Sequence, residues 1–453
     1  MKFNFKTLLS NGEFTRNVIT LVKGTTIAQA IPILISPILT RIYSPSEFGI
    51  LAIYISLLSI LSVISTGKYE LAIMLPDDEE EAIQLIWLSF FMSVISSVII
   101  FLLLTLSYHD ISHYFGFDGN SDFIIYILPI SIVMFGGVQA ITMFLNRNKS
   151  YVAMSRTKVI NNAASGASQM LVYFSTNGLI IGYIIGQLSS FVYISNVIRC
   201  KIADGRVSGD FRPNVRFIFS LAFKYRVFPL VNSTSSLLNT SSVQLIPIVL
   251  TNIFSSAIAG FYSLAQRILQ MPMSLLGSSI SQVYFQKARE IFENKDELKR
   301  LTIEINKKLL LIGALPIFIT LLFGEHIFAL IFGEEWKVAG EYARYLAPWI
   351  YLVFISSPLS NLIIVMGKQS ALLKFNFLLF VSRIGWFAVV YLLNIESSTA
   401  IIVHANIGTM AWLAFIFYVM KLAEIDFVVT LKQLFPFALL TSLSYIIGEA
   451  LVF

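Results

Sequence analysis

Long apolar stretches, separated by short polar connections, run along almost the whole chain. A helix that crosses the hydrocarbon core of a bilayer, roughly 30 Å thick, needs about 20 mostly apolar residues. Thirteen stretches are long enough: 18–39, 47–66, 82–106, 122–145, 155–175, 178–198, 225–250, 254–284, 307–331, 343–366, 371–393, 399–421 and 429–452. The fifth is the most polar, because Asn161, Asn162 and Gln169 interrupt it. The pattern predicts an all-α polytopic membrane protein with twelve spans and a thirteenth helix at its C-terminal end.

The composition indicates that lipid surrounds these helices. Of the 453 residues, 56% are hydrophobic and 13% are charged, whereas a soluble domain carries about 25% charged residues. The single cysteine, Cys200, leaves disulfide, zinc and iron–sulfur sites without ligands. The sequence has no phosphate-binding loop and no paired-carboxylate site, and we interpret the His and Asp residues of the loop 107–121 as solvated. We therefore expect neither enzymatic activity nor a metal or cofactor.

The distribution of basic residues predicts how the spans are oriented. If the N-terminus is cytoplasmic, 27 of the 32 Lys and Arg residues fall at cytoplasmic ends or loops. Cytoplasmic loops hold an excess of Lys and Arg in membrane proteins. The net charge of +6 is explained in this way without nucleic acid as a partner. The pattern predicts a multi-pass membrane protein with its N-terminus in the cytoplasm, and it does not say which membrane.

An internal repeat divides the twelve spans into halves. At an offset of 211 residues, LTRIYSPSEFG (39–49) aligns with LTNIFSSAIAG (250–260), with five of eleven positions identical. Six spans separate the copies, so both halves have the same orientation, as in transporters with parallel repeats. The predicted organisation is an N-lobe at 1–200, a cytoplasmic loop at 201–224, a C-lobe at 225–422 and an additional span at 423–453.

Polar residues at helical spacing mark a candidate binding face. Arg267 lies about fourteen residues from the outer end of its span, roughly 21 Å deep. Ser263 and Gln270 share its face at steps of four and three residues. Charged groups inside spans tend to face a cavity or a partner. We interpret this face as the lining of a water-filled cavity, although serines alone are more typical of helix packing.

Five further residues are candidates for the same cavity. Asn232 and Asn239 share a face of the seventh span, and Gln29 lies on a polar face of the first. For Arg383, a cavity and a buried structural pair are equally open. For Lys23, anchoring at the cytoplasmic interface is favoured over contact with substrate.

Several segments together carry a resemblance to a known family. They include KGTTIAQAIPILISPILTRIYSPSEFG (23–49), GKYELAIMLPDDEEEA (67–82) and GFYSLAQRILQMPMSLLGSSISQVY (260–284). The chain resembles Wzx-type O-antigen and polysaccharide flippases of the multidrug/oligosaccharidyl-lipid/polysaccharide exporter superfamily. The resemblance implies two six-helix lobes around a central cavity.

The resemblance also implies an activity. Such flippases move an undecaprenyl-pyrophosphate-linked oligosaccharide from the cytoplasmic to the periplasmic leaflet by alternating access. Related lipid II flippases have an arginine before a proline in the eighth span, similar to QRILQMP (266–272), which implies a substrate-binding role for Arg267. Their essential arginines in the first two spans have no clear match. The implied partners are the lipid-linked oligosaccharide, the bilayer and other polysaccharide-assembly membrane proteins. A drug/cation antiporter of the same superfamily and a membrane polymerase or ligase remain alternatives.

Overall fold

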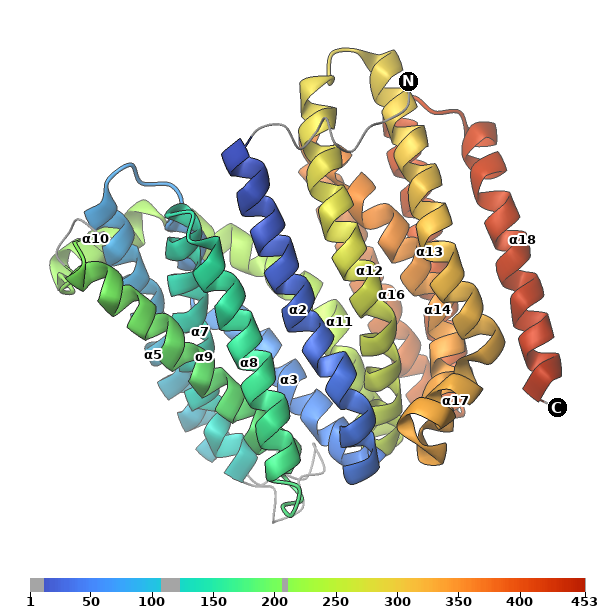
Figure 1. Cartoon of the computed structure of the whole chain (residues 1–453), viewed down its shortest axis with the longest axis horizontal. Coiled ribbons are helices and arrows are strands. Elements are labelled where there is room, and N and C mark those ends of the chain that lie inside the picture. The colour runs from blue at the N-terminus through green and yellow to red at the C-terminus, as the bar shows by residue number, and fades with distance from the viewer. Residues whose placement is uncertain (1–11, 107–122, 206–210, 453) are drawn as a thin grey trace. The chain divides into compact units, whose positions relative to one another are not determined.

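The described part of the chain consists of helices joined by turns and short connections, and it contains no strand (Figure 1). The structure is a computed structural model that describes residues 12–106, 123–205 and 211–452. Its longer helices are α2 (Gly12–Ile42), α3 (Pro45–Ser65), α5 (Glu79–Leu106), α7 (Phe123–Arg147), α8 (Tyr151–Leu171), α9 (Gly178–Ala203), α10 (Val215–Lys224), α11 (Ser233–Ile253), α12 (Ser256–Glu290), α13 (Lys295–Phe332), α14 (Lys337–Leu359), α16 (Gln369–Leu393), α17 (Ser397–Leu422) and α18 (Phe427–Val452). The predicted all-α class is confirmed.

The lengths and apolarity of these helices identify a multi-pass membrane protein. Within the described residues, 10 helices are long and apolar enough to cross a bilayer. One of them is Phe427–Tyr445 in α18, where the sequence predicts a thirteenth span. The other three predicted spans correspond to α8, α11 and α12, which are long enough but more polar.

The polarity of α8 has a structural cause. The Asn162 side chain donates to the Ala28 carbonyl oxygen at 2.6 Å, and Gln169 Nε2 donates to the Leu179 carbonyl oxygen at 2.9 Å. Asn161 Nδ2 lies 3.2 Å from the Ser190 hydroxyl of α9. A buried polar group is tolerated when it is hydrogen-bonded. The residues that interrupt the fifth apolar stretch therefore join α8 to α2 and α9.

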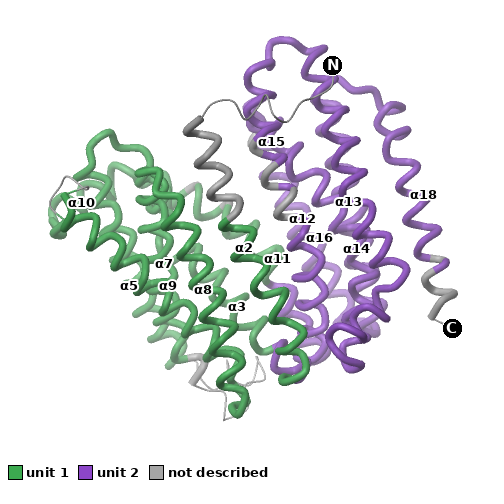
Figure 2. Tube along the Cα trace, in the orientation of Figure 1, with its two compact units in different colours: residues 1–43, 50–244 green, residues 44–49, 245–453 purple. Residues whose placement is uncertain are grey.

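The chain forms two compact units (Figure 2). Unit 1 comprises residues 1–43 and 50–244, and unit 2 comprises 44–49 and 245–453. This division falls within α11 and places the first turn of α3 in unit 2. The lobe boundaries at 201–224 and 423–453 remain predictions.

Residues 211–225 of unit 1 pack against the beginning of α5. Gln84 Nε2 donates to the Arg212 carbonyl oxygen at 2.9 Å, and Trp87 Nε1 donates to that of Phe211 at 2.8 Å. Glu81 accepts from Lys224 at 2.5 Å and from the Tyr225 hydroxyl at 2.8 Å. Hydrogen bonding to Glu81 raises the pKa of Lys224. Part of the segment predicted as a loop is thus the helix α10, which is too short to span a membrane.

Two glycines of the sequence repeat lie where the start of α3 crosses α12 in unit 2. A Cβ atom on Gly49 would lie 1.8 Å from the Ser256 carbonyl oxygen, and one on Gly260 would lie 2.0 Å from the Pro45 oxygen. At the offset of 211, Gly49 corresponds to Gly260 and Pro45 to Ser256, so the contact is reciprocal. Reciprocal contacts are typical of a twofold relation. The repeat is therefore visible in the packing as well as in the sequence.

We expect Gly49→Ala and Gly260→Ala each to lower the apparent melting temperature of the purified protein. The new methyl group would overlap a backbone oxygen, and overpacking costs about 1–3 kcal/mol of stability. Gly385→Ala in α16 is the matched control, because a Cβ atom there meets nothing within 4 Å. Equal melting temperatures for Gly260→Ala and Gly385→Ala would contradict the close crossing.

Candidate functional site

The predicted polar face of α12 lies on the surface of unit 2. Arg267 and Gln270 are exposed, and Ser263 is partly buried. The opposite face of the same turns is buried, with Tyr262 and Leu269 directed into the unit. The helix continues without interruption past Pro272. A guanidinium and an amide on one exposed helix face can both donate to an anionic or hydroxylated ligand.

Three other predicted residues belong to unit 1. Asn239 of α11 is exposed, and Gln29 of α2 is partly buried. Asn232 is partly buried and ends a π-helical turn, Phe228–Asn232, just before α11. Such turns are frequent at functional sites. The side chain of Lys23 lies outside the described residues.

The structure thus brings Ser263, Arg267 and Gln270 together on α12, within one unit. Gln29, Asn232 and Asn239 belong to the other unit. A single cavity lined by both groups remains a prediction.

Arg383 has a different environment from Arg267. Its side chain is 3% exposed, and its guanidinium carbon lies 4.6 Å from the centre of the Trp349 ring. The buried His404 ring lies 5.3 Å from the same tryptophan, and its Nε2 is 3.5 Å from the Tyr262 hydroxyl. This is a packed cation–π arrangement. Of the two interpretations of Arg383, the packing favours the structural one, and a role in substrate binding remains a prediction.

Two ion pairs with buried carboxylates were not anticipated. Arg344 Nη1 lies 2.5 Å from Glu325 Oε1, and the arginine is 2% exposed. The sequence places Arg344 at the outer interface, but α14 begins at Lys337, which moves Arg344 about two turns into the helix. Glu70 is also buried and lies 3.5 Å from Lys68. The apolar pattern does not show either pair, because Arg344 meets Glu325 through the packing of α13 against α14, and Lys68 meets Glu70 through the turn before Tyr69.

Comparison with known protein families identifies the family of this chain. Residues 38–341 match the family described as "Polysaccharide biosynthesis protein". The chain belongs to this family. A relative, the capsular polysaccharide biosynthesis protein CapF of Staphylococcus aureus, is 23% identical over 272 residues. That match covers 58% of this chain and 66% of the relative, which is slightly less than two thirds of its length.

Three solved structures have a fold similar to that of this chain. The lipid II flippase MurJ in an inward closed conformation gives a TM-score of 0.65 at 14% identity, covering 96% of this chain and 98% of that one. A transporter of the MOP superfamily from Pyrococcus furiosus gives 0.63 at 13% identity, covering 94% and 100%. An outward-facing multidrug resistance transporter of the MATE family gives 0.61 at 14% identity, covering 94% and 99%. The chain therefore shares its fold with these three proteins.

Proposed function

We propose that this polysaccharide biosynthesis family member is a flippase. Its substrate is an undecaprenyl-pyrophosphate-linked repeat unit of O-antigen or another surface polysaccharide. It moves that unit from the cytoplasmic to the periplasmic leaflet of a bacterial inner membrane by alternating access. The observation that carries the proposal is an exposed arginine on a polar face of α12, in a chain with the MOP fold and polysaccharide-family membership.

The chemistry of Arg267 suits such a substrate. A pyrophosphate is strongly anionic and is poorly solvated within a bilayer. A guanidinium can pair with phosphate oxygens in a bidentate geometry, which fixes the headgroup as well as attracting it. The neighbouring amide of Gln270 is exposed and can bond sugar hydroxyls, whereas the Ser263 hydroxyl is buried. The lipid tail stays in the bilayer, so only the headgroup needs a polar route.

Cation antiport is less well supported by the same residues. An antiporter needs a carboxylate that exchanges its cation during transport. Glu325 is engaged by Arg344 and Glu70 by Lys68, so each of these buried carboxylates already has a cationic partner. These two carboxylates are therefore less available to exchange a transported cation, and the exposed Arg267 favours an anionic headgroup as the cargo.

Depletion of the protein in cells that make a surface polysaccharide tests the function. We expect the lipid-linked repeat unit to accumulate in the cytoplasmic leaflet. In spheroplasts, membrane-impermeant periodate would then oxidise only a small part of it. Restoring the protein should expose the unit and restore surface polymer.

The same assay separates the flippase from an enzyme. A polymerase or ligase would leave the unit fully accessible to periodate but unpolymerised after depletion. That outcome would overturn the flippase proposal. The control is depletion in cells that cannot begin synthesis of the unit, where no signal is expected in either leaflet.

A further inference from the structure

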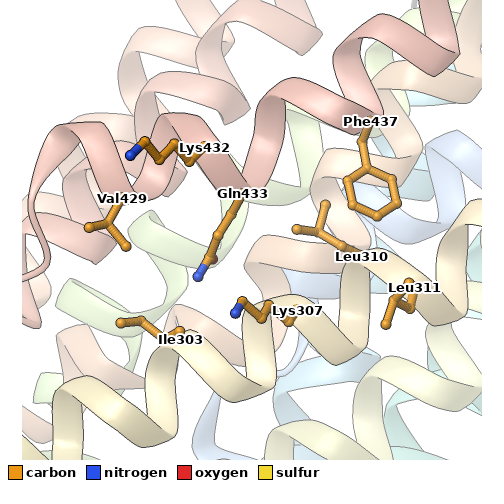
Figure 3. Close-up of a pocket in the computed structure, with 8 residues that line it drawn as sticks. All are labelled: Ile303, Lys307, Leu310, Leu311, Val429, Lys432, Gln433 and Phe437. Carbon is orange, nitrogen blue, oxygen red and sulfur yellow. The ribbon is translucent and has the colours of Figure 1, made fainter.

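A groove separate from the polar face of α12 lies between α13 and α18 of unit 2 (Figure 3). Its volume is about 450 Å³. It combines apolar and basic side chains from both helices, and those that define its chemistry are Lys307, Leu310, Leu311, Lys432, Gln433 and Phe437. Leu311 and Phe437 lie at one end, and the two lysines lie toward the other (Figure 3).

Polar contacts join α18 to α13 beside this groove and to α14 farther along. Asn306 Nδ2 donates to Gln433 Oε1 at 2.6 Å beside the lysines. Farther along, the Arg344 guanidinium of α14 lies 5.5 Å from the centre of the Tyr445 ring of α18. The groove is therefore bounded by helices that are fixed to the same unit.

The two lysines of the groove are not neutralised by carboxylates. Other lysines of α13 form ion pairs: Lys295 with Glu424 at 2.5 Å, Lys299 with Asp426 at 3.9 Å, and Lys308 with Glu304 at 2.6 Å. Among the side chains that the structure describes, Lys307 and Lys432 have no carboxylate close enough to form an ion pair. The nearby acids are thus engaged elsewhere, and the groove keeps two positive charges.

The surface around the groove is apolar. Leu311 is 69% exposed, and Leu315 of α13 and Phe435 of α18 are also exposed. Residues 432 to 437 span about 7.5 Å along α18, enough for the first part of an acyl chain. A ligand that satisfies both the charges and this surface has an anionic headgroup and an apolar chain.

We propose that this groove binds an anionic phospholipid of the cytoplasmic leaflet. Lys307 and Lys432 hold its phosphate, and one acyl chain lies along Leu310, Leu311 and Phe437. The charge distribution of the sequence places both lysines on the cytoplasmic side, where membranes carry anionic lipids that attract basic segments. The bound lipid joins α18 to α13. This site does not depend on the proposed transport activity.

Lipid retention by the purified full chain tests the site. The protein is exchanged into micelles containing dioleoyl phosphatidylglycerol or dioleoyl phosphatidylcholine, and bound lipid is counted by native mass spectrometry. We expect the parent protein to retain phosphatidylglycerol and to gain apparent melting temperature from it. The double variant K307Q/K432Q should bind this lipid about tenfold more weakly or worse, because two charge-assisted contacts are lost.

Lys308→Gln is the matched control, because it removes a lysine from the adjacent position that already pairs with Glu304. Its retention of phosphatidylglycerol should equal that of the parent. Equal retention of the two lipids by the parent, or equal loss in Lys308→Gln and the double variant, would overturn the proposal. Protection by inorganic phosphate as strong as by phosphatidylglycerol would also overturn it, since the ligand would then be a free anion. If the double variant does not fold, the salt dependence of the parent decides: lipid retention that does not weaken with added salt contradicts the lysine contacts.

Discussion

Arg267→Ala is expected to abolish surface polysaccharide while the protein accumulates at its normal level. The residue is exposed on α12, so its removal leaves no cavity in unit 2. If it binds the pyrophosphate, its loss removes charge-assisted hydrogen bonds that contribute about 1.5–3 kcal/mol each. Two such bonds correspond to a decrease in transport of more than a hundredfold. The measurements are surface polymer and membrane protein level in the same cells.

Arg267→Lys separates the geometry of this residue from its charge. Lysine keeps the positive charge but lacks the planar fork that matches phosphate oxygens, so we expect partial activity. Arg289→Ala is the control on the same helix, because Arg289 is also exposed but lies near the C-terminal end of α12. Normal surface polymer with Arg267→Ala at normal protein level would exclude Arg267 from the site without excluding the flippase function.

The helices themselves could be predicted because a run of about 20 apolar residues has few structural alternatives. The polar helices were harder, and α8 shows why. Hydropathy counts Asn162 and Gln169 as residues that favour water, whatever their partners are. In unit 1 both donate to backbone oxygens of neighbouring helices, so these residues stabilise the packing of α8 against α2 and α9. Such partners cannot be read from the polarity of one segment.

The candidate site was predictable only as a pattern on single helices. Spacing alone places Ser263, Arg267 and Gln270 on one face, and the structure shows Arg267 and Gln270 exposed on the surface of unit 2. For Arg383, which also lies deep in its span, the sequence left a cavity and a buried structural pair equally open. The difference appears in the packing: Arg383 lies against Trp349 in the core of unit 2. Whether a side chain is buried depends on how several helices pack together, and the spacing of residues along one helix does not show this.

The Arg344–Glu325 pair depends on the close approach of α13 and α14. A Cβ atom on Gly340 would lie 2.5 Å from the Gly324 carbonyl oxygen, so the two backbones come together where both residues lack side chains. Glu325 follows Gly324 directly, and Arg344 lies one helical turn after Gly340, so both charges lie beside this close approach. Arg344 Nε also donates to the Leu321 carbonyl oxygen at 3.1 Å, which satisfies a second nitrogen of the guanidinium. The pair is therefore both buried and hydrogen-bonded.

Arg344→Ala is expected to lower the stability of the protein by about 3–5 kcal/mol, because it leaves the buried Glu325 carboxylate without its counter-charge. Glu325→Ala should have a similar effect for the reverse reason. The double variant Arg344→Met/Glu325→Leu replaces both charges with apolar groups of similar size and should be more stable than either single variant. Apparent melting temperatures of the purified proteins measure the three effects.

Two outcomes would contradict a coupled buried pair. One is that both single variants have the melting temperature of the parent protein, and the other is that the decrease in the double variant equals the sum of the two single decreases. The expected result separates this arginine from Arg267, because the loss at Arg344 is in folding and the loss at Arg267 is in transport.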